Sequence, residues 1–273
     1  MNKRAMSKIN WNDINVFESL RIYNGKIFRF EEHLKRLCES AKSCGVLIPS
    51  NSEIKQKVFQ KIKTEKIHDG FLRLDFRAGK MQVLLREKKI SANIFGINLK
   101  TASFRMPSPK ESIVQAKSGN YRLQLLETVS GGLNEMLFLD ENHFITEARV
   151  GNFFMVKKGM IFTPPAHSAL NGITREVVIE CARELGVLVK ETLLTRHEAF
   201  NADEAFLTNT SWEILPVRSL DGRLVQESVP GSMTQKLIKC FHRKVQLACQ
   251  PQKKIPQIKK LSAPSSQSRI KKV

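Results

Sequence analysis

The first half of the chain changes between the apolar spacing of strands and that of helices. Residues 14–23 and 26–30 have the pattern of two strands, and the Asn24-Gly25 pair between them tolerates the positive φ that a tight hairpin turn requires. From Glu31 to Ser43 apolar residues recur at steps of three and four, and Gly45 supplies a C-terminal stop. The pattern predicts a β-hairpin followed by a helix.

A second helix is predicted from about Ser52, with a buried face made of Ile54, Val58, Phe59 and Ile62. Strand-like runs follow at 71–77, 81–87 and 91–99. A hairpin, two helices and further strands in this order favour an α+β fold.

Residues 101–116 carry two prolines and three serines and have no clear period, which is typical of a connection between domains. We therefore predict an N-terminal α/β domain over 1–105, a linker over 106–116 and a second domain over 117–250.

The second half again mixes strands with helices. A clear helix is predicted from Gly172, with Val177, Val178, Cys181, Ala182 and Leu185 on its apolar face. The other predicted elements are helices at 121–130, 196–200 and 232–249 and strands at 135–139, 143–146, 152–157, 160–163, 187–193 and 204–208. A polar turn is predicted at 208–211.

The net charge of +19 raises the question of a nucleic-acid partner. Seven of the positive charges lie in residues 251–273, which contain no acidic side chain and are interleaved with Pro, Ser and Gln. This composition predicts a disordered basic tail. The tail lacks the aromatic residues that stack on single strands, so we do not expect a nucleic acid as the main partner.

Neither a secretory signal nor a membrane span is predicted, because the N-terminus leads into polar sequence and no apolar run approaches the ~18–20 residues of a spanning helix. The five cysteines form an odd number without C-x-x-C spacing. They are expected to be reduced thiols in a cytoplasmic protein, and no metal site is predicted.

Lysine 117 is the first candidate for chemistry. It stands in Gln115-Ala-Lys-Ser-Gly-Asn-Tyr121, at the end of the polar connection and next to a flexible Ser-Gly pair. A lone lysine is usually solvated. Its interpretation therefore depends on whether the other parts of a lysine-based cofactor site occur in the chain.

Two stretches offer donors for an anion. In Leu170-Asn-Gly-Ile-Thr-Arg-Glu176 a glycine and a threonine open a helix, and the unpaired N–H groups and the helix dipole suit a phosphate. Thr208-Asn-Thr-Ser211 follows an apolar strand and presents hydroxyls and N–H groups to a phosphate or a carboxylate. Taken alone, the first is also compatible with a plain helix cap and the second with an ordinary turn.

Two charged residues complete the set. Glu147 lies near the end of an apolar strand, and a buried glutamate needs a cationic partner, such as a protonated pyridine nitrogen. Arg36 lies beside the apolar Leu37-Cys38 pair, at the edge of a buried helix face, where a snorkelling surface arginine is the alternative.

The order and spacing of these motifs resemble the class IV pyridoxal-phosphate aminotransferases. This group contains the branched-chain aminotransferases, the D-amino acid aminotransferases and the aminodeoxychorismate lyases. The resemblance runs from about Val16 to Leu237 and includes the stretches 23–37, 134–140 and 206–217. It implies a two-domain fold of type IV, with a larger C-terminal domain containing a mixed, barrel-like sheet.

The resemblance also implies roles for individual residues. Lys117 would form the internal aldimine with pyridoxal 5'-phosphate and move the substrate proton, and Glu147 would keep the pyridine nitrogen protonated. The implied phosphate site consists of Arg36, Gly172, Ile173, Thr174 and Thr210, and Tyr121 would lie beside the phenolic oxygen. The implied substrate site consists of Tyr23, Phe28, Arg73, Thr210 and Ser211.

The substrate is less sharply defined than the cofactor. Phe71-Leu-Arg73 is similar to the Tyr-x-Arg segment of branched-chain enzymes, and the Arg-x-His pair of D-specific enzymes does not follow Arg77-Ala-Gly79. The short Lys117-Ser-Gly-Asn-Tyr spacing instead is similar to the lyases and the D-specific enzymes, and Thr208-Asn-Thr-Ser is similar to the lyases. Arg149 stands where most members have Ser or Thr beside the cofactor.

We therefore predict an aminotransferase for branched-chain L-amino acids and 2-oxoglutarate, by resemblance a homodimer. The first alternative is 4-amino-4-deoxychorismate lyase, and the second is D-amino acid aminotransferase.

Overall fold

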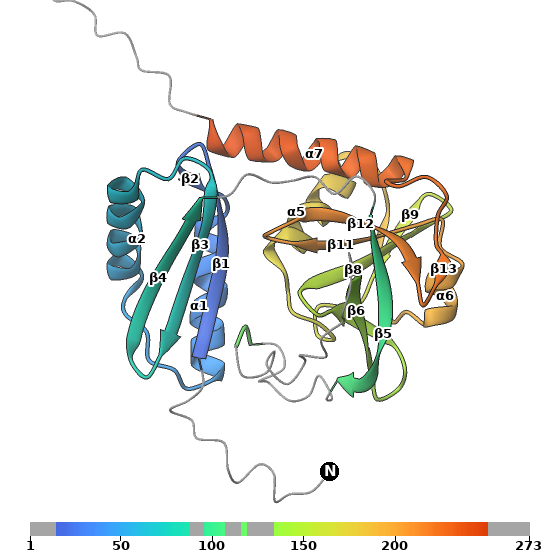
Figure 1. Ribbon diagram of the computed structural model, residues 1–273, viewed down its shortest axis with the longest axis horizontal. Helices are drawn as coiled ribbons and strands as arrows, with labels where there is room; N and C mark the ends of the chain where they lie inside the picture. The colour runs from blue at the N-terminus through green and yellow to red at the C-terminus, as the bar shows by residue number, and fades with distance from the viewer. Residues whose placement is uncertain (1–14, 88–95, 107–115, 119–133, 251–273) are drawn as a thin grey trace, which may run out of the picture.

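The computed structural model describes residues 15–87, 96–106, 116–118 and 134–250. Within these residues the chain builds two sheets, a four-stranded one and a nine-stranded one, which lie side by side in Figure 1. Helices and strands alternate along the chain without a regular βαβ repeat, as the predicted α+β class requires.

The smaller sheet has the strand order β2-β1-β3-β4 and is antiparallel throughout. Its strands are β1 (Asn15–Tyr23), β2 (Lys26–Ile27), β3 (Gly70–Arg77) and β4 (Lys80–Glu87). The hairpin between β1 and β2 is confirmed, because Asn24 and Gly25 have φ values of 50° and 72° and Tyr23 pairs with Lys26. This turn fixes which side chains of β1 point to each face.

Two helices cover the smaller sheet, α1 (Phe30–Ser43) and α2 (Asn51–Glu65). Helix α2 begins with a capping box between Ser50 and Glu53. Ile54, Val58 and Ile62 are buried as predicted, but Phe59 is 52% exposed. Phe59 was expected on the buried face; it lies at the edge of that face, where its ring makes an edge contact with Phe30 at 5.5 Å.

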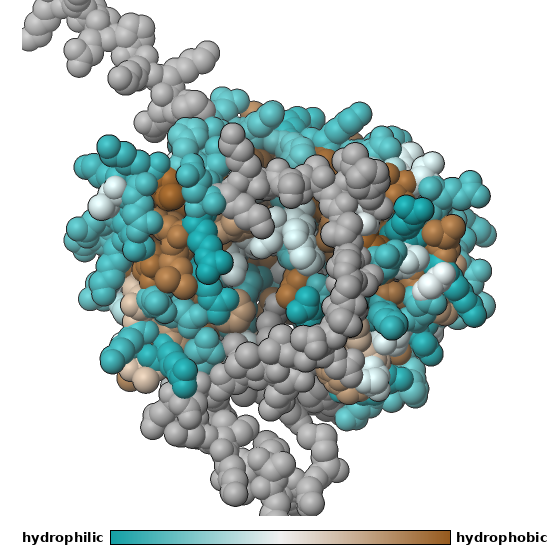
Figure 2. Space-filling model, viewed as in Figure 1, coloured by the Kyte–Doolittle hydropathy of each residue, from teal (hydrophilic) through white to brown (hydrophobic). Residues whose placement is uncertain are grey.

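The core of this unit contains Val16, Leu20 and Ile22 from one face of β1 together with apolar residues of α1, α2 and β3. Where α2 meets β4, partly buried apolar side chains pack against this core, and Figure 2 shows them as an apolar strip on a largely polar face. Glu18 lies on the same face of β1 as the three apolar residues and is 0% exposed.

The larger sheet has the order β10-β9-β8-β11-β12-β5-β6-β7, with β13 added beside β12. An additional pairing of β7 with β8 closes part of the sheet into a barrel. Its strands are β5 (Ile97–Met106), β6 (Asn134–Asp140), β7 (Ile145–Ala148), β8 (Gly151–Lys157), β9 (Met160–Thr163), β10 (Val189–Glu191), β11 (Glu204–Asn209), β12 (Glu213–Leu220) and β13 (Arg223–Leu224).

Residues 101–105, whose composition is typical of a connection between domains, and Met106, the first residue of the predicted linker, lie in a strand. They belong to β5, which pairs in parallel with β12 and β6, and Ala102 and Met106 are buried. A register shift between Thr101 and Arg105 in the pairing with β6 interrupts the two-residue alternation, which explains why the sequence shows no strand period there. Strand β4 belongs to the smaller sheet and β5 to the larger one, so the chain passes from one sheet to the other between them. The division into domains stays a prediction, and residues 107–115 and the predicted helix 121–130 lie outside the described residues.

Within the described residues three helices accompany the larger sheet: α5 (Ile173–Glu184), α6 (Arg196–Phe200) and α7 (Ser232–Cys249). Helices α5 and α7 pack against each other and against β11, in a core that includes Val178, Phe206 and Phe241. Helix α7 runs along the top of the molecule in Figure 1, above both sheets. All five cysteines are free, and in the described part of the chain no helix has the length and apolar character to cross a membrane.

Candidate active site

A pocket between the two sheets gathers most of the charged residues singled out from the sequence. We call it the charged pocket. Arg36 comes from α1, Lys117 from the short segment after the predicted linker, and Glu147 from β7. The rest of its lining consists of Val150, Gly151, Asn152, Leu170, Gly172, Ile173, Thr174, Thr208, Asn209 and Thr210.

Lys117 is anchored to the smaller unit through its backbone. Its N–H donates to Ser40 Oγ at 3.1 Å, and its carbonyl accepts from the N–H of Phe17 at 3.1 Å. The side chain is 9% exposed, with Nζ 5.6 Å from the centre of the Phe17 ring and 3.8 Å from Oε2 of Glu18. The amine is thus held at the boundary of the two sheets, beside the strand that the hairpin turn sets in register.

Arg36 lies beside Lys117 in a network built around Glu18. Its Nε and Nη2 donate to the two carboxylate oxygens of Glu18 at 2.7 and 2.8 Å, and its Nη1 donates to the carbonyl of Asn171 at 2.8 Å. His33 Nδ1 lies 2.7 Å from Glu18 Oε2. Arg36 therefore joins α1 to the loop that precedes α5.

Glu18 was not predicted as a site residue. Burial by itself raises the pKa of Glu18, but the charges of Arg36 and Lys117 and the contact with His33 bring it well below the usual range, so the group is a carboxylate. Burial lowers the pKa of His33, which favours the neutral ring. A signal was present in the sequence, because Glu18 interrupts the apolar alternation of Val16, Leu20 and Ile22.

The N-terminus of α5 forms one wall of the charged pocket. Gly172 is the N-cap residue, with φ −76° and ψ 133°, and no side chain caps the helix. A Cβ built on Gly172 would lie 2.1 Å from Oδ1 of Asn152, whose Nδ2 donates to the carbonyl of Leu170 at 2.7 Å. Glycine thus allows Asn152 to reach the helix end, where the first N–H groups lack intrahelical partners.

Glu147 contacts the same loop as Asn152 and is 5% exposed. Its Oε2 accepts from the N–H of Leu170 at 3.2 Å, and in the β7–β8 pairing Glu147 is opposite Asn152. The structure therefore places the predicted acid in the same pocket as Lys117 and the end of α5.

The residues of the 208–211 turn contribute unequally to the charged pocket. Thr210 lines the charged pocket as predicted, but Ser211 is exposed and its N–H donates to Oδ1 of Asn209 at 2.8 Å. Thr208, the first residue of the polar stretch noted in the sequence, lines the pocket with a buried Oγ1 that has no hydrogen-bond partner among the described residues.

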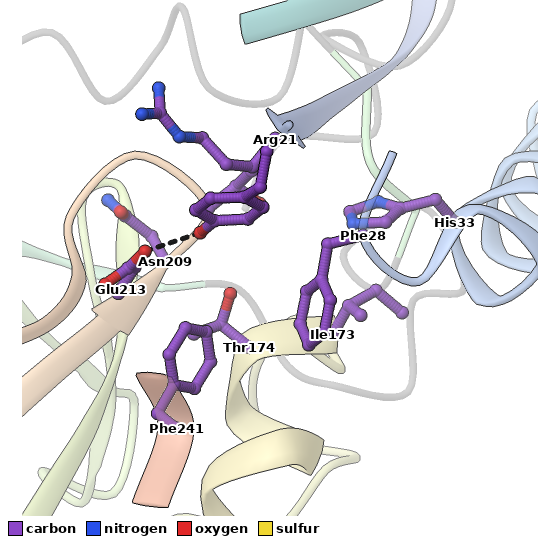
Figure 3. A pocket seen from close by; sticks show the side chains of 10 residues that line it. Arg21, Phe28, His33, Ile173, Thr174, Asn209, Glu213 and Phe241 are labelled. Carbon is purple, nitrogen blue, oxygen red and sulfur yellow. Dashed lines mark hydrogen bonds between the residues drawn. The ribbon is translucent and has the colours of Figure 1, made fainter. Parts of the chain in front are cut away.

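A second pocket, which we call the aromatic pocket, adjoins the charged one and is drawn in Figure 3. The two share Ile173, Thr174, Asn209 and Thr210, and the remaining lining of the aromatic pocket is Arg21, Tyr23, Phe28, His33, Glu213 and Phe241. The ring of Phe28 makes edge contacts with Tyr23 and Phe241 at 6.1 and 5.8 Å. The wall between the pockets is thus the end of α5 and the turn after β11.

The tyrosine of this pocket is tied to the larger sheet. Tyr23 Oη donates to Oε1 of Glu213 at 2.5 Å, shown as the dashed line in Figure 3, and His242 Nε2 contacts Oε2 of Glu213 at 2.7 Å. Burial raises the pKa of Tyr23, and the neighbouring Glu213 carboxylate raises it further, so the phenol is neutral.

Of the predicted site residues that the structure describes, Arg73 and Ser211 line neither pocket. Arg73 on β3 bonds to Asp75 and stacks on Phe17, with Cζ 3.9 Å from the ring centre. Tyr121 lies outside the described residues. Arg149, which the sequence placed beside the cofactor, pairs with Glu135 at 3.0 Å.

Residues 15–220 match the family model described as amino-transferase class IV. The chain belongs to the class IV aminotransferase family. Enzymes of this family depend on pyridoxal phosphate, so the chain is a pyridoxal-phosphate-dependent aminotransferase and its direct substrates are small molecules. The predicted family and enzyme class are confirmed.

Individual relatives agree with this assignment. The branched-chain-amino-acid aminotransferase of Pseudomonas aeruginosa is 32% identical over 252 residues, which cover 83% of this chain and 82% of the relative. The crystal structure of the branched-chain amino acid aminotransferase from Escherichia coli is 33% identical with a TM-score of 0.76, covering 84% of this chain and 83% of that one.

A third relative contains a ligand. The T.th. branched-chain amino acid aminotransferase, complexed with N-(5'-phosphopyridoxyl)-L-glutamate, is 26% identical with a TM-score of 0.78, covering 88% of this chain and 86% of that one. These similarities confirm the predicted type IV fold with its mixed, partly closed sheet.

Proposed function

We propose that this aminotransferase binds pyridoxal 5'-phosphate in the charged pocket and transfers the amino group of branched-chain L-amino acids to 2-oxoglutarate. The observation that carries the proposal is the convergence of a buried lysine, a buried carboxylate and an uncapped helix N-terminus in one pocket. These are the groups that a phosphorylated pyridine aldehyde requires.

The residues of the charged pocket fit the phosphate. The first N–H groups of α5, at Ile173 and Thr174, and the helix dipole favour an anion. The buried Oγ1 of Thr208, which has no partner among the described residues, supplies a further donor. Arg36 adds a positive charge at the pocket and, through Asn171, fixes the loop leading to the helix. Thr210 lies on the same wall.

The two remaining groups fit the pyridine ring and its aldehyde. When bound, the cofactor withdraws electrons from the Cα of the substrate. Glu147, 5% exposed, would hold a proton on the pyridine nitrogen, because a buried carboxylate stabilises a neighbouring cation. Lys117 Nζ would carry the cofactor and, once released, remove the proton from the substrate Cα. Tyr121 is proposed to lie beside the phenolic oxygen on the resemblance alone.

The choice of branched-chain substrates is supported by the three relatives above, all named as branched-chain enzymes, and by Phe71-Leu-Arg73. We propose that the apolar side chain of the substrate lies against Tyr23 and Phe28 in the aromatic pocket. The glutamate adduct in the third relative supports 2-oxoglutarate as acceptor. Roles of Arg73 and Ser211 at the substrate, a homodimer and a cytoplasmic location rest on the resemblance alone.

A substrate panel tests the proposal. The purified holoenzyme is given L-leucine with 2-oxoglutarate, D-alanine with 2-oxoglutarate, and aminodeoxychorismate in separate reactions, and glutamate, pyruvate and the oxo acids are quantified. We expect leucine turnover to exceed the other two, with Lys117→Ala as the blank. Pyruvate release from aminodeoxychorismate that exceeds leucine turnover would replace the proposal by a lyase.

A further inference from the structure

Glu18 is the most enclosed charged group beside Lys117. Its side chain is 0% exposed and lies on the face of β1 that packs against α1. One oxygen, Oε1, accepts from Arg36 Nε at 2.7 Å. The other, Oε2, accepts from Arg36 Nη2 at 2.8 Å, contacts His33 Nδ1 at 2.7 Å and lies 3.8 Å from Lys117 Nζ.

This arrangement exceeds what is needed to bury one carboxylate. A bidentate arginine already compensates its charge. Oε2 is nevertheless shared by three nitrogens, and the third belongs to the lysine of the pocket. His33 adds a hydrogen bond without a charge, because burial favours its neutral ring. The single negative charge of Glu18 is therefore divided between two cations, Arg36 and Lys117.

We propose that Glu18 is a positioning residue that acts through Lys117: it stabilises the ammonium form of the free lysine and keeps Nζ at the boundary of the two sheets. The inference rests on the proposed role of Lys117 in moving the substrate proton. An ammonium held in this way retains the proton taken from the substrate until it is returned to the product. Arg36, bound to the same carboxylate, links this function to the loop before α5.

The other charged groups around the lysine do not replace this carboxylate. From α1 the two pockets receive His33 and Arg36, and the latter repels an ammonium. Glu147 of β7 lines the charged pocket at the Leu170 loop, where its Oε2 accepts a backbone N–H. Arg73 of β3 lies against the Phe17 ring and adds a further positive charge. Apart from Glu18, the side chains that α1 and β3 contribute here are therefore neutral or positively charged.

The test measures Lys117 itself in the apoprotein. Acetic anhydride acetylates only unprotonated amines, so the acetylation rate of Lys117 as a function of pH, quantified by peptide mass spectrometry, gives the midpoint of its deprotonation. In Glu18→Gln we expect this midpoint to fall by about one pH unit or more, because a negative charge next to the ammonium is lost. In Glu18→Asp, where the carboxylate is drawn back towards β1, we expect a smaller fall.

Glu204→Gln is the matched control. Glu204 is also a buried carboxylate, 7% exposed, but it binds the N–H groups of Met233 and Thr234 at the start of α7 and does not line the charged pocket. In Glu204→Gln the pH midpoint for deprotonation of Lys117 should equal that in the parent protein. A general loss of packing would shift the control as well, so an equal shift in Glu204→Gln would overturn the inference.

Glu18→Asp keeps the inference testable if Glu18→Gln does not fold, because it retains the charge. An unchanged midpoint in each Glu18 variant that folds would overturn the proposal and leave Glu18 as a structural partner of Arg36. The apoprotein experiment needs neither cofactor nor substrate. If the substrate panel shows no amino transfer, the aminotransferase proposal fails, while a shifted midpoint still establishes the coupling of Glu18 and Lys117.

Discussion

The charged pocket and the aromatic pocket share one wall but differ in everything else that lines them. The shared wall is the start of α5 and the turn at Asn209-Thr210. On one side it faces Arg36, Lys117 and Glu147; on the other it faces rings from β1, the loop after β2, and α7. A single helix end thus serves an ionic site and an apolar site. Their chemistry is decided by the different residues that face the helix end on each side, and each side can therefore be altered separately.

Loss of Lys117 should abolish the function of the charged pocket. We expect Lys117→Ala to lose the visible absorbance of bound cofactor and to reduce leucine turnover by on the order of 10⁴-fold, because it removes both the attachment point and the proton carrier. Absorbance spectra and steady-state rates measure this. Lys35→Ala, an exposed lysine next to Arg36, is the control and should retain both. A coloured Lys117→Ala protein would contradict the assignment.

Neutralising the acid should affect the same pocket less severely. Glu147→Gln is expected to retain cofactor absorbance but to lose about 10²–10³-fold in kcat, because the buried negative charge that keeps the pyridine nitrogen protonated is removed. The comparison is with Glu141→Gln, an exposed residue between β6 and β7. Full activity of Glu147→Gln would exclude this residue as the partner of the nitrogen.

A side chain added at Gly172, the N-cap residue of α5, should test the wall that the two pockets share. In Gly172→Ala the new Cβ would lie 2.1 Å from Asn152 Oδ1, so the asparagine must move and its bond to Leu170 is lost. We expect the Kd of the apoprotein for pyridoxal 5'-phosphate to rise about tenfold and the free energy of unfolding to fall by about 1–3 kcal/mol. Fluorescence titration and denaturant unfolding measure these two quantities. Wild-type affinity in Gly172→Ala would show that this helix end does not hold the phosphate.

The aromatic side should respond through substrate affinity. Phe28 is 7% exposed and contacts Tyr23 and Phe241. We expect Phe28→Ala to raise KM for leucine about tenfold with little change in the cofactor spectrum, since an apolar contact discriminates by about 10–200-fold. Leu224→Ala, at an exposed site on β13, controls for loss of an apolar side chain. An unchanged KM would place the substrate side chain elsewhere.

The smallest effect is expected at the polar edge of the aromatic pocket. The hydrogen bond to Glu213 raises the pKa of His242 above its ordinary 6.5. A raised pKa stabilises the fold below about pH 6.5, and the contribution is lost as the pH rises through the higher folded value. Because the His242 side chain is 54% exposed, the contribution is at most about 1 kcal/mol. His242→Gln should lower Tm more at pH 6 than at pH 9, and an equal loss at both would contradict the ion pair.

Much of the fold could be predicted because the apolar pattern is strong where one face of an element is buried. Strand β1 and helices α1 and α7 follow the predicted ranges closely, while β2 ends at Ile27, before the predicted end at residue 30. The pattern did not indicate the strand at residues 101–106, where a register shift interrupts the alternation of β5, and the prediction failed at Phe59, which lies on the edge of its helix face. Period alone does not distinguish an irregular buried strand from a linker.

The site was predicted in part for a similar reason. Motifs that are continuous in sequence, such as Gly172-Ile-Thr174, were found together with Lys117 and Glu147. Glu18 was missed because its function depends on contacts with α1 and residue 117, which only the folded chain brings together. The position of Arg73 against Phe17, outside both pockets, is likewise a matter of packing in three dimensions.

The tight turn at Asn24-Gly25 limits how this chain can change its length. Alternate side chains of β1 serve opposite purposes, with Glu18 facing α1 and Arg21 facing the aromatic pocket. Insertion of one residue within β1 would move each side chain beyond the insertion to the opposite face of the strand. A phenylalanine or arginine side chain would then take the place of Glu18 beside Arg36 and His33. We expect such an insertion to abolish activity even when the larger sheet still folds. Insertions in the connection between β3 and β4, where the turn at Ala78-Gly79 is exposed, leave this alternation intact.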